Sequence, residues 1–167
     1  MNRRNFIRNS LGVLLLPAVT LAAAPVLSYG EEVRDFSRKF LDLELSTTQI
    51  AILDGKLTNP PRQVGYSTAG IAACLHHFHT TGKRAIYWSN TYAFTNFYQF
   101  DHLIQPYRKK TGAKGLLTNR VHASYLRAYN PNTLFVMDHF FYTNYCDHLV
   151  RFFARNAQRV ITNHPII

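Results

Sequence analysis

The chain has 167 residues, 47% of them hydrophobic and 17% charged, and its formal net charge is +10 at pH 7. This length and apolar content suit one globular domain with a buried core and leave no need for a second domain. Residues 31–54 hold six acidic and three basic side chains, whereas residues 55–167 hold three acidic and thirteen basic ones. Because aromatic residues do not alternate with these bases as in nucleic-acid-binding motifs, the basic body indicates either a solvated surface or one that binds an anionic polymer, and argues against nucleic acid.

Residues 1–30 have the order of an export signal, in which basic, apolar and small residues follow one another. Arg3 and Arg4 come first, an apolar run over residues 11–16 follows, and alanines occupy positions 22–24. The apolar run is short and interrupted by a proline, so it predicts a signal peptide, with no transmembrane helix in the mature chain. The paired arginines resemble a twin-arginine signal. A general secretory signal and an uncleaved anchor are the alternatives.

The twin-arginine resemblance implies a protein that folds in the cytoplasm before export to the periplasm or cell envelope, often with a cofactor. No cofactor motif is recognisable, so the cofactor stays unknown. Signal cleavage after Ala23 or after Gly30 avoids placing Pro25 beside the scissile bond. In an oxidising compartment, Cys74 and Cys146 either form a disulfide or remain buried thiols.

The acidic segment, residues 31–62, is expected to pack on an α/β domain formed by residues 63–167. Apolar residues at helical spacing over residues 33–43 predict a short amphipathic helix. Residues 47–55 are expected to form a strand that ends in a turn at Asp54 and Gly55. Two prolines then predict a loop over residues 58–61.

A helix expected over residues 67–82 contains the densest group of potential metal ligands in the chain. On a helix, Cys74 and His77 share one face while His76 and His79 share another, so the four do not converge on one ion. His76 and His79 are a weak candidate for a pair of metal ligands, although they lack the i, i+4 spacing of the zinc protease motif. The other interpretation is the polar face of a helix that covers a sheet.

Four short aliphatic or aromatic runs predict strands, over residues 84–90, 114–119, 133–139 and 159–164. Segments with helical spacing follow the first three, near residues 95–111, 121–129 and 143–156. Strands that alternate with helices form βαβ units. The expected fold is therefore α/β, with three layers and a mainly parallel sheet that has helices on both faces, as in Rossmann-like or flavodoxin-like proteins.

The predicted strands end in similar polar groups, which a parallel sheet would bring to one edge. Ligands of such sheets bind outside the carboxyl ends of the strands, where helix N-termini also point. The polar groups either bind a ligand there or cap the following helices. The candidate ligand-binding residues are Ser89, Asn90, Asn119, Asn163 and His164.

Each acidic residue after position 54 precedes a histidine, in the dipeptides Asp101-His102, Asp138-His139 and Asp147-His148. Adjacent side chains on a helix diverge, so the first and third dipeptides are not local dyads. Asp138 and His139 end a predicted strand, where α/β enzymes place catalytic carboxylates, and with His164 they are a candidate metal or acid–base site of a hydrolase. No serine elbow, P-loop or glycine-rich dinucleotide turn accompanies them.

The order of three segments in the second half of the chain is similar to that in a family of small exported accessory proteins encoded by integrating conjugative elements. These segments are GAKGLLTN (residues 112–119), TLFVMD (133–138) and RVITNHPI (159–166), with an Asn-Pro turn before the second. The resemblance implies a non-enzymatic envelope component of a DNA-transfer apparatus, with other envelope proteins as partners and no catalytic residues. A binding component and a hydrolase are therefore the two functional hypotheses.

Overall fold

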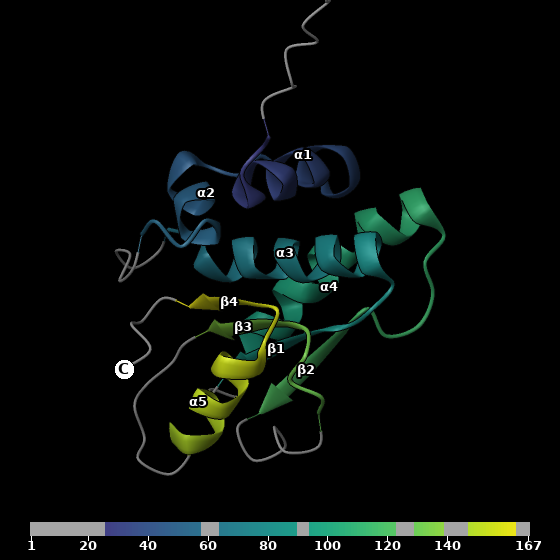
Figure 1. The fold of residues 1–167 in the computed structure, drawn as a ribbon. Coiled ribbons are helices and arrows are strands. Elements are labelled where there is room, and N and C mark those ends of the chain that lie inside the picture. The colour runs from purple at the N-terminus through teal and green to yellow at the C-terminus, as the bar shows by residue number, and fades with distance from the viewer. Residues whose placement is uncertain (1–25, 58–63, 90–93, 123–128, 139–146, 163–167) are drawn as a thin grey trace, which may run out of the picture.

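The computed structural model describes residues 26–57, 64–89, 94–122, 129–138 and 147–162 (Figure 1). Five helices and four strands lie in these ranges. In chain order they are α1 (Tyr29–Leu41), α2 (Thr47–Leu53), α3 (Tyr66–Thr81), β1 (Ala85–Ser89), α4 (Phe94–Thr111), β2 (Thr118–His122), β3 (Leu134–Asp138), α5 (Asp147–Asn156) and β4 (Arg159–Thr162).

The four strands form one sheet in the order β2-β1-β3-β4, and each neighbouring pair is parallel. This confirms the predicted parallel α/β sheet. The chain places β2 on one side of β1 and β3 on the other, so the strand order reverses between β1 and β3. That point is the topological switch point, outside which open α/β sheets bind their ligands.

The strands are in level register, which gives the sheet two well-defined edges. At the amino edge, where the strands begin, Ala85 pairs with Thr118 and Leu134 pairs with Arg159. At the carboxyl edge, where they end, Ser89 pairs with both His122 and Asp138. Groups at the end of one strand therefore lie one strand spacing, about 4.8 Å, from those of its neighbour.

Helices cover both faces of the sheet, as predicted (Figure 1). Successive strand residues point to opposite faces. Tyr87 and Val136 accordingly join the core under α3 and α4, whereas Trp88 and Phe135 join a second core with Phe153 of α5. α1 and α2 lie outside α3 and form an additional layer on that side.

Small residues bring α3 directly onto the sheet. Ala69, Ala72 and Ala73 are fully buried on this helix. A Cβ atom at Gly70 would lie 2.8 Å from the Val136 Cγ1 atom, closer than side chains tolerate. The absence of a side chain at Gly70 therefore sets the distance between α3 and β3.

The predicted strand over residues 47–55 is wrong, because residues 47–53 form α2. The Ser46 side chain accepts a hydrogen bond from the Gln49 N–H, and the Gln49 side chain accepts one from the Ser46 N–H at 2.8 Å. This reciprocal capping box starts a helix. The Gln49 amide also donates to the Gly65 carbonyl at 3.0 Å, which ties α2 to the start of α3.

The second strand begins at Thr118 and not at residue 114 as predicted. Gly112 and Gly115 have φ angles of 70° and 76°, which glycine adopts without strain, and so residues 112–117 turn before the strand starts. The predicted helix over residues 121–129 is wrong at its start, because Val121 and His122 belong to β2. Residues 123–128 lie outside the described ranges.

The other helices agree with the predictions within a few residues. α1, α3 and α4 occupy the positions predicted from residues 33–43, 67–82 and 95–111. α5 is described from Asp147, whereas the residues predicted to precede it in the helix lie outside the described ranges.

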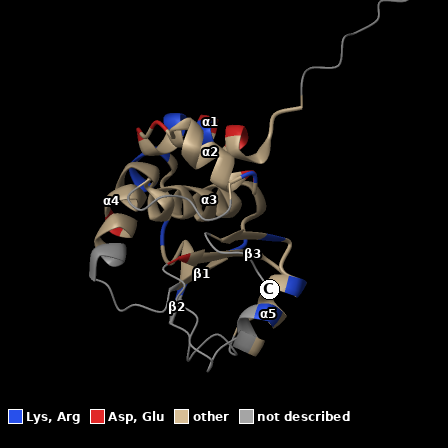
Figure 2. Ribbon diagram, turned by 90° about the vertical axis from the view of Figure 1, so that its left-hand side faces the viewer, with Lys and Arg blue, Asp and Glu red and all other residues tan. Residues whose placement is uncertain are grey.

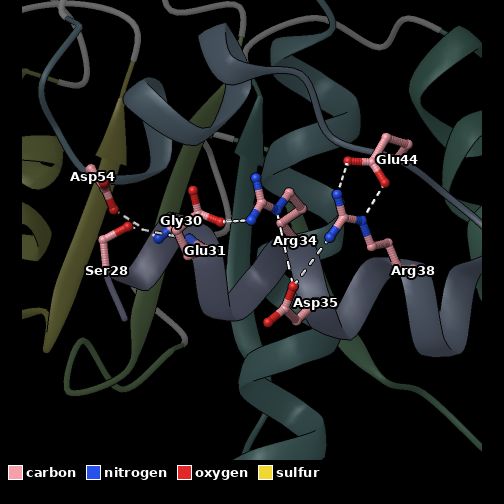
Figure 3. Close-up of polar contacts among 8 residues, drawn as sticks. All are labelled: Ser28, Gly30, Glu31, Arg34, Asp35, Arg38, Glu44 and Asp54. Carbon is pink, nitrogen blue, oxygen red and sulfur yellow. Dashed lines mark hydrogen bonds and ion pairs between the residues drawn. The ribbon is translucent and has the colours of Figure 1, made fainter. Parts of the chain in front are cut away.

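The charges of the acidic segment are largely paired with one another (Figure 3). Arg34 forms ion pairs with Glu31 and Asp35, and Arg38 forms ion pairs with Asp35 and Glu44. In Figure 2 the acidic segments gather mainly on the layer of α1 and α2, whereas the basic segments are spread over the molecule. The bases outside this layer therefore dominate the net charge.

Asp54, at the end of α2, holds the start of α1. Its Oδ1 atom accepts a hydrogen bond from the Gly30 N–H at 2.7 Å, and its side chain is 5% exposed (Figure 3). Burial acts to raise the pKa of Asp54, but hydrogen bonds from Lys56, Gly30 and Ser28 lower it overall. An anionic carboxylate at a helix N-terminus is favourable, so this contact joins α1 and α2 into one unit.

Candidate functional site

The candidate site lies at the carboxyl edge, at the switch point between β1 and β3. Ser89 and Asp138 are the last residues of these two strands and pair with each other in the sheet. The position of Asp138 at the end of β3 agrees with the sequence prediction.

Asp138 is held by a tyrosine from the neighbouring strand. Asp138 as a residue is 2% exposed, and its carboxylate accepts a hydrogen bond from the Tyr87 hydroxyl group of β1. Burial, and then the charge of Asp138, raise the pKa of Tyr87. Tyr87 therefore remains protonated and acts as a hydrogen-bond donor to the carboxylate.

The first turn of α3 completes this arrangement. Ser67 is hydrogen-bonded to Tyr87, which gives a chain of three polar side chains ending at Asp138. The Tyr66 hydroxyl donates to the Met137 carbonyl at 2.8 Å. α3 is thus fastened to both strands of the switch point, with its N-terminal end at the carboxyl edge.

Sequence reasoning missed Tyr66, Ser67 and Tyr87 as members of this site. Ser67 was expected only to open a helix, and Tyr87 lay inside a predicted strand. The position of Tyr66 and Ser67 in the chain was the available signal, because a helix that precedes a parallel strand begins near the carboxyl edge of the sheet. Tyr87 and Asp138 are 51 residues apart, and no local pattern indicates their contact.

The other predicted site residues have different outcomes. Ser89 lies at the carboxyl edge as predicted, but Asn119 does not, because the later start of β2 places it beside Ile86 near the beginning of the strand. His122 takes the place at the edge that was expected for Asn119. The predicted site residues outside the described ranges are Asn90, His139, Asn163 and His164.

His76 and His79 share one helix face, as expected, and that face packs on an aromatic cluster. The rings of both histidines lie 5.4 Å from the Phe36 ring of α1. His79 Nδ1 is hydrogen-bonded to the Tyr107 hydroxyl of α4 at 3.2 Å. Within the described ranges, no group of three or more His, Cys, Asp or Glu side chains is placed to hold a metal ion. The pair therefore helps to join α1, α3 and α4.

Cys74 is a buried free thiol on α3. Burial raises its pKa, so the thiol stays protonated. Cys146, with which a disulfide was considered, lies outside the described ranges.

His76 is expected to make the stability of the fold depend on pH between about 4 and 6.5. Burial, and then the neighbouring His79 and His77, lower the pKa of His76 from its ordinary value to about 4. Its buried Nδ1 atom has no hydrogen-bond partner among the described residues. The unfolded chain binds this proton more readily, so the free energy of unfolding is highest above pH 6.5 and falls as the pH decreases toward 4.

Urea unfolding at pH 7 and pH 4.5 would measure this effect in the wild type and in His76→Phe, which keeps a ring against Phe36 but does not titrate. On acidification the free energy of unfolding should fall more in the wild type than in the variant. The pKa shift sets an upper limit of about 3 kcal/mol for this difference, and the partial exposure of the ring to solvent reduces it. Equal losses in the two proteins would show that His76 titrates as it does in the unfolded chain.

The fold and the carboxyl edge together define an open, parallel α/β protein in which a tyrosine holds the carboxylate of Asp138 at the switch point. No family model, curated protein or solved structure matches the chain. None of the helices in the described ranges is long and apolar enough to span a membrane.

Proposed function

We propose that the protein is an exported, non-enzymatic component of the cell envelope that binds a small ligand or a partner protein at the carboxyl edge of its sheet. The observation that carries this proposal is the position of Asp138, which Tyr87 holds at the switch point between β1 and β3. Binding sites of open α/β sheets lie at this point because the strand order leaves a crevice there.

The burial of Asp138 favours binding over catalysis. A general acid or base must come within hydrogen-bond reach of the proton that it transfers. Asp138 is 2% exposed and already accepts a hydrogen bond from Tyr87. Its geometry suits a group that fixes the shape of the edge for a ligand.

Export is the second part of the proposal and is supported by the signal-like order of residues 1–30. The structure of α1 adds a constraint on where the signal would be removed. The Ser28 side chain caps α1, and the Gly30 N–H is bonded to Asp54. Cleavage after Gly30 would remove both contacts, whereas cleavage after Ala23 leaves them intact, so these contacts support cleavage before Ser28.

The finer part of the proposal is a role as an accessory protein of a conjugative DNA-transfer apparatus. The similarity of residues 112–119, 133–138 and 159–166 to accessory proteins of integrating conjugative elements supports it. In this role the partners would be other envelope proteins.

A hydrolase is the second candidate function, and one observation favours it. Ser67, Tyr87 and Asp138 form a continuous hydrogen-bonded chain that begins at the N-terminal turn of a helix. A serine hydroxyl that donates into such a chain is polarised. With His139 and His164, this edge would be a metal-dependent or acid–base site.

Cell fractionation and affinity purification test both candidates. We expect the wild type in the periplasm with an N-terminus before Ser28, and the variant Arg3→Lys with Arg4→Lys in the cytoplasm. Asp138→Asn should be exported but lose the envelope proteins that co-purify with the wild type. Asp101→Asn is the matched control, since Asp101 is an exposed carboxylate of α4, and it should keep them.

Three results would contradict the proposal. Full-length wild-type protein in the cytoplasm would contradict the proposed export. Equal recovery of partners with Asp138→Asn and Asp101→Asn would contradict the proposed binding site at Asp138. Stoichiometric zinc, iron or copper that is lost in His164→Ala would favour the hydrolase.

A further inference from the structure

We propose that the amino edge of the sheet docks the protein on an anionic phospholipid surface. This edge lies at the opposite end of the strands from the candidate site, so the inference does not depend on the proposed function. Five exposed bases lie either in the last turn of a helix or in the segment that joins that helix to the next strand. They are Lys83 and Arg84 before β1, Lys109 and Lys114 before β2, and Arg155 before β4.

The topology brings these bases to one edge. In a parallel sheet every helix that follows a strand returns the chain to the start of the next strand. Ala85 is paired with Thr118, and Ile86 with Phe135, which is paired with Val160, so β1, β2 and β4 begin level with one another. Figure 1 shows the ends of α3 and α4 on the same side of the molecule, where the chain enters β1 and β2.

These five bases differ from those of the acidic segment in having no ion pair with any described residue. Arg34 and Arg38 on α1 each contact two carboxylates. Lys110, beside Lys109, is paired with Asp42, and Arg159 lies 3.9 Å above the Tyr29 ring. The positive charge of the five is therefore available to an anionic partner.

The helix dipole does not account for the whole group. Bases in the last turn of a helix are stabilised by the negative end of the dipole, which explains Lys109 and Arg155. Lys83, Arg84 and Lys114 lie beyond the last residues of α3 and α4, where the dipole effect fades.

Hydrogen bonds fix the middle of the amino edge, so the five basic residues are attached to a rigid part of the backbone. The Thr133 hydroxyl donates to the Arg84 carbonyl at 3.1 Å and is hydrogen-bonded to His77 Nε2 at 3.0 Å. The Gln158 N–H donates to the Thr133 carbonyl at 3.0 Å, which extends the connection to the start of β4.

An exposed leucine among the bases favours a lipid surface over nucleic acid. Leu116, two residues after Lys114, is 48% exposed, whereas the next residue, Leu117, is 1% exposed. A lipid surface accepts an apolar side chain below its headgroups and attracts the surrounding bases. Proteins that bind single-stranded nucleic acid instead present aromatic rings on which bases stack.

Sedimentation of the full chain with phospholipid vesicles tests the proposal. The neutral vesicles contain phosphatidylcholine alone, and the anionic ones also contain about 30% phosphatidylglycerol. Each base near an anionic surface contributes about a fivefold gain in partitioning, so Lys83→Gln with Lys114→Gln should weaken binding to anionic vesicles about 25-fold. The matched control, Arg34→Gln with Lys56→Gln, removes the same charge from the layer of α1 and α2 and should bind like the wild type. Residues 1–25 are common to all variants, so their contribution cancels.

Leu116→Ser distinguishes lipid from other polyanions. It should weaken binding to anionic vesicles and leave binding to a DNA oligonucleotide unchanged. Equal weakening by the two double variants, equal binding to neutral and anionic vesicles, or binding to DNA without binding to vesicles would each overturn the proposal.

Discussion

Replacing Phe153 with alanine is expected to lower the free energy of unfolding by about 3–5 kcal/mol. Phe153 is 1% exposed, and among the described residues it is the α5 side chain that enters the core on this face of the sheet. Its ring centroid lies 5.6 Å from that of Phe135 in β3. Truncation leaves a cavity against the sheet that the neighbouring rings fill only partly, so the loss exceeds the transfer free energy of the ring alone.

Phe152 is the matched control, because it is the same residue type at the preceding position of the same helix. It is 52% exposed, so Phe152→Ala should change the free energy of unfolding by no more than about 0.5 kcal/mol. Guanidinium unfolding of both variants at pH 7 measures the difference. Similar losses in the two variants would show that α5 is rotated relative to the described packing.

The layered fold was predictable because its main signals are local. The runs that became β1, β3 and β4 are short, apolar and followed by polar residues, and helical spacing separates them. β2 was placed too early because Leu116 and Leu117 look like an apolar strand, although Leu116 is 48% exposed. The turn at Gly112 and Gly115 determined the true start of the strand, and sequence alone does not reveal the sign of φ at a glycine.

The error at α2 has a different cause. Thr47, Thr48, Ile50 and Ile52 are β-branched residues, which favour strands. The capping box between Ser46 and Gln49 outweighed this preference, together with the packing of the helix on α3. A serine followed three residues later by glutamine was visible in the sequence, but such a signature also occurs outside helices.

The candidate site was predictable only at the strand ends, Ser89 and Asp138. A carboxylate that ends an apolar run is a local feature, and the parallel sheet placed it at the edge. Its partners Tyr87 and Ser67 come from elements that meet it only after the chain has folded. Tertiary contacts of this kind leave no periodic signal, so the hydrogen-bonded chain required the structure.

The second large effect is expected at the buried contact between Tyr87 and Asp138. Tyr87→Phe removes the hydroxyl that donates to the carboxylate and should lower the free energy of unfolding by about 1.5–3 kcal/mol, as for hydrogen bonds to charged groups. Tyr66→Phe is the matched control, because its hydroxyl donates to the neutral carbonyl of Met137. It should cost only about 0.5–1.5 kcal/mol in urea unfolding at pH 7. Equal costs would show that the contact between Tyr87 and Asp138 is no stronger than a hydrogen bond to a neutral carbonyl.

The same pair separates a binding site from a scaffold when stability and partner recovery are measured together. Asp138→Asn keeps an oxygen that accepts from Tyr87, so it should lower the unfolding free energy less than Tyr87→Phe does. If the buried carboxylate of Asp138 orders the carboxyl edge for a ligand, this mildly destabilised variant should still lose its envelope partners, while the less stable Tyr87→Phe keeps part of them. Functional sites commonly trade stability for activity in this way. Partner recovery that instead follows the unfolding free energy across Asp138→Asn, Tyr87→Phe and Tyr66→Phe would identify Asp138 as part of the scaffold.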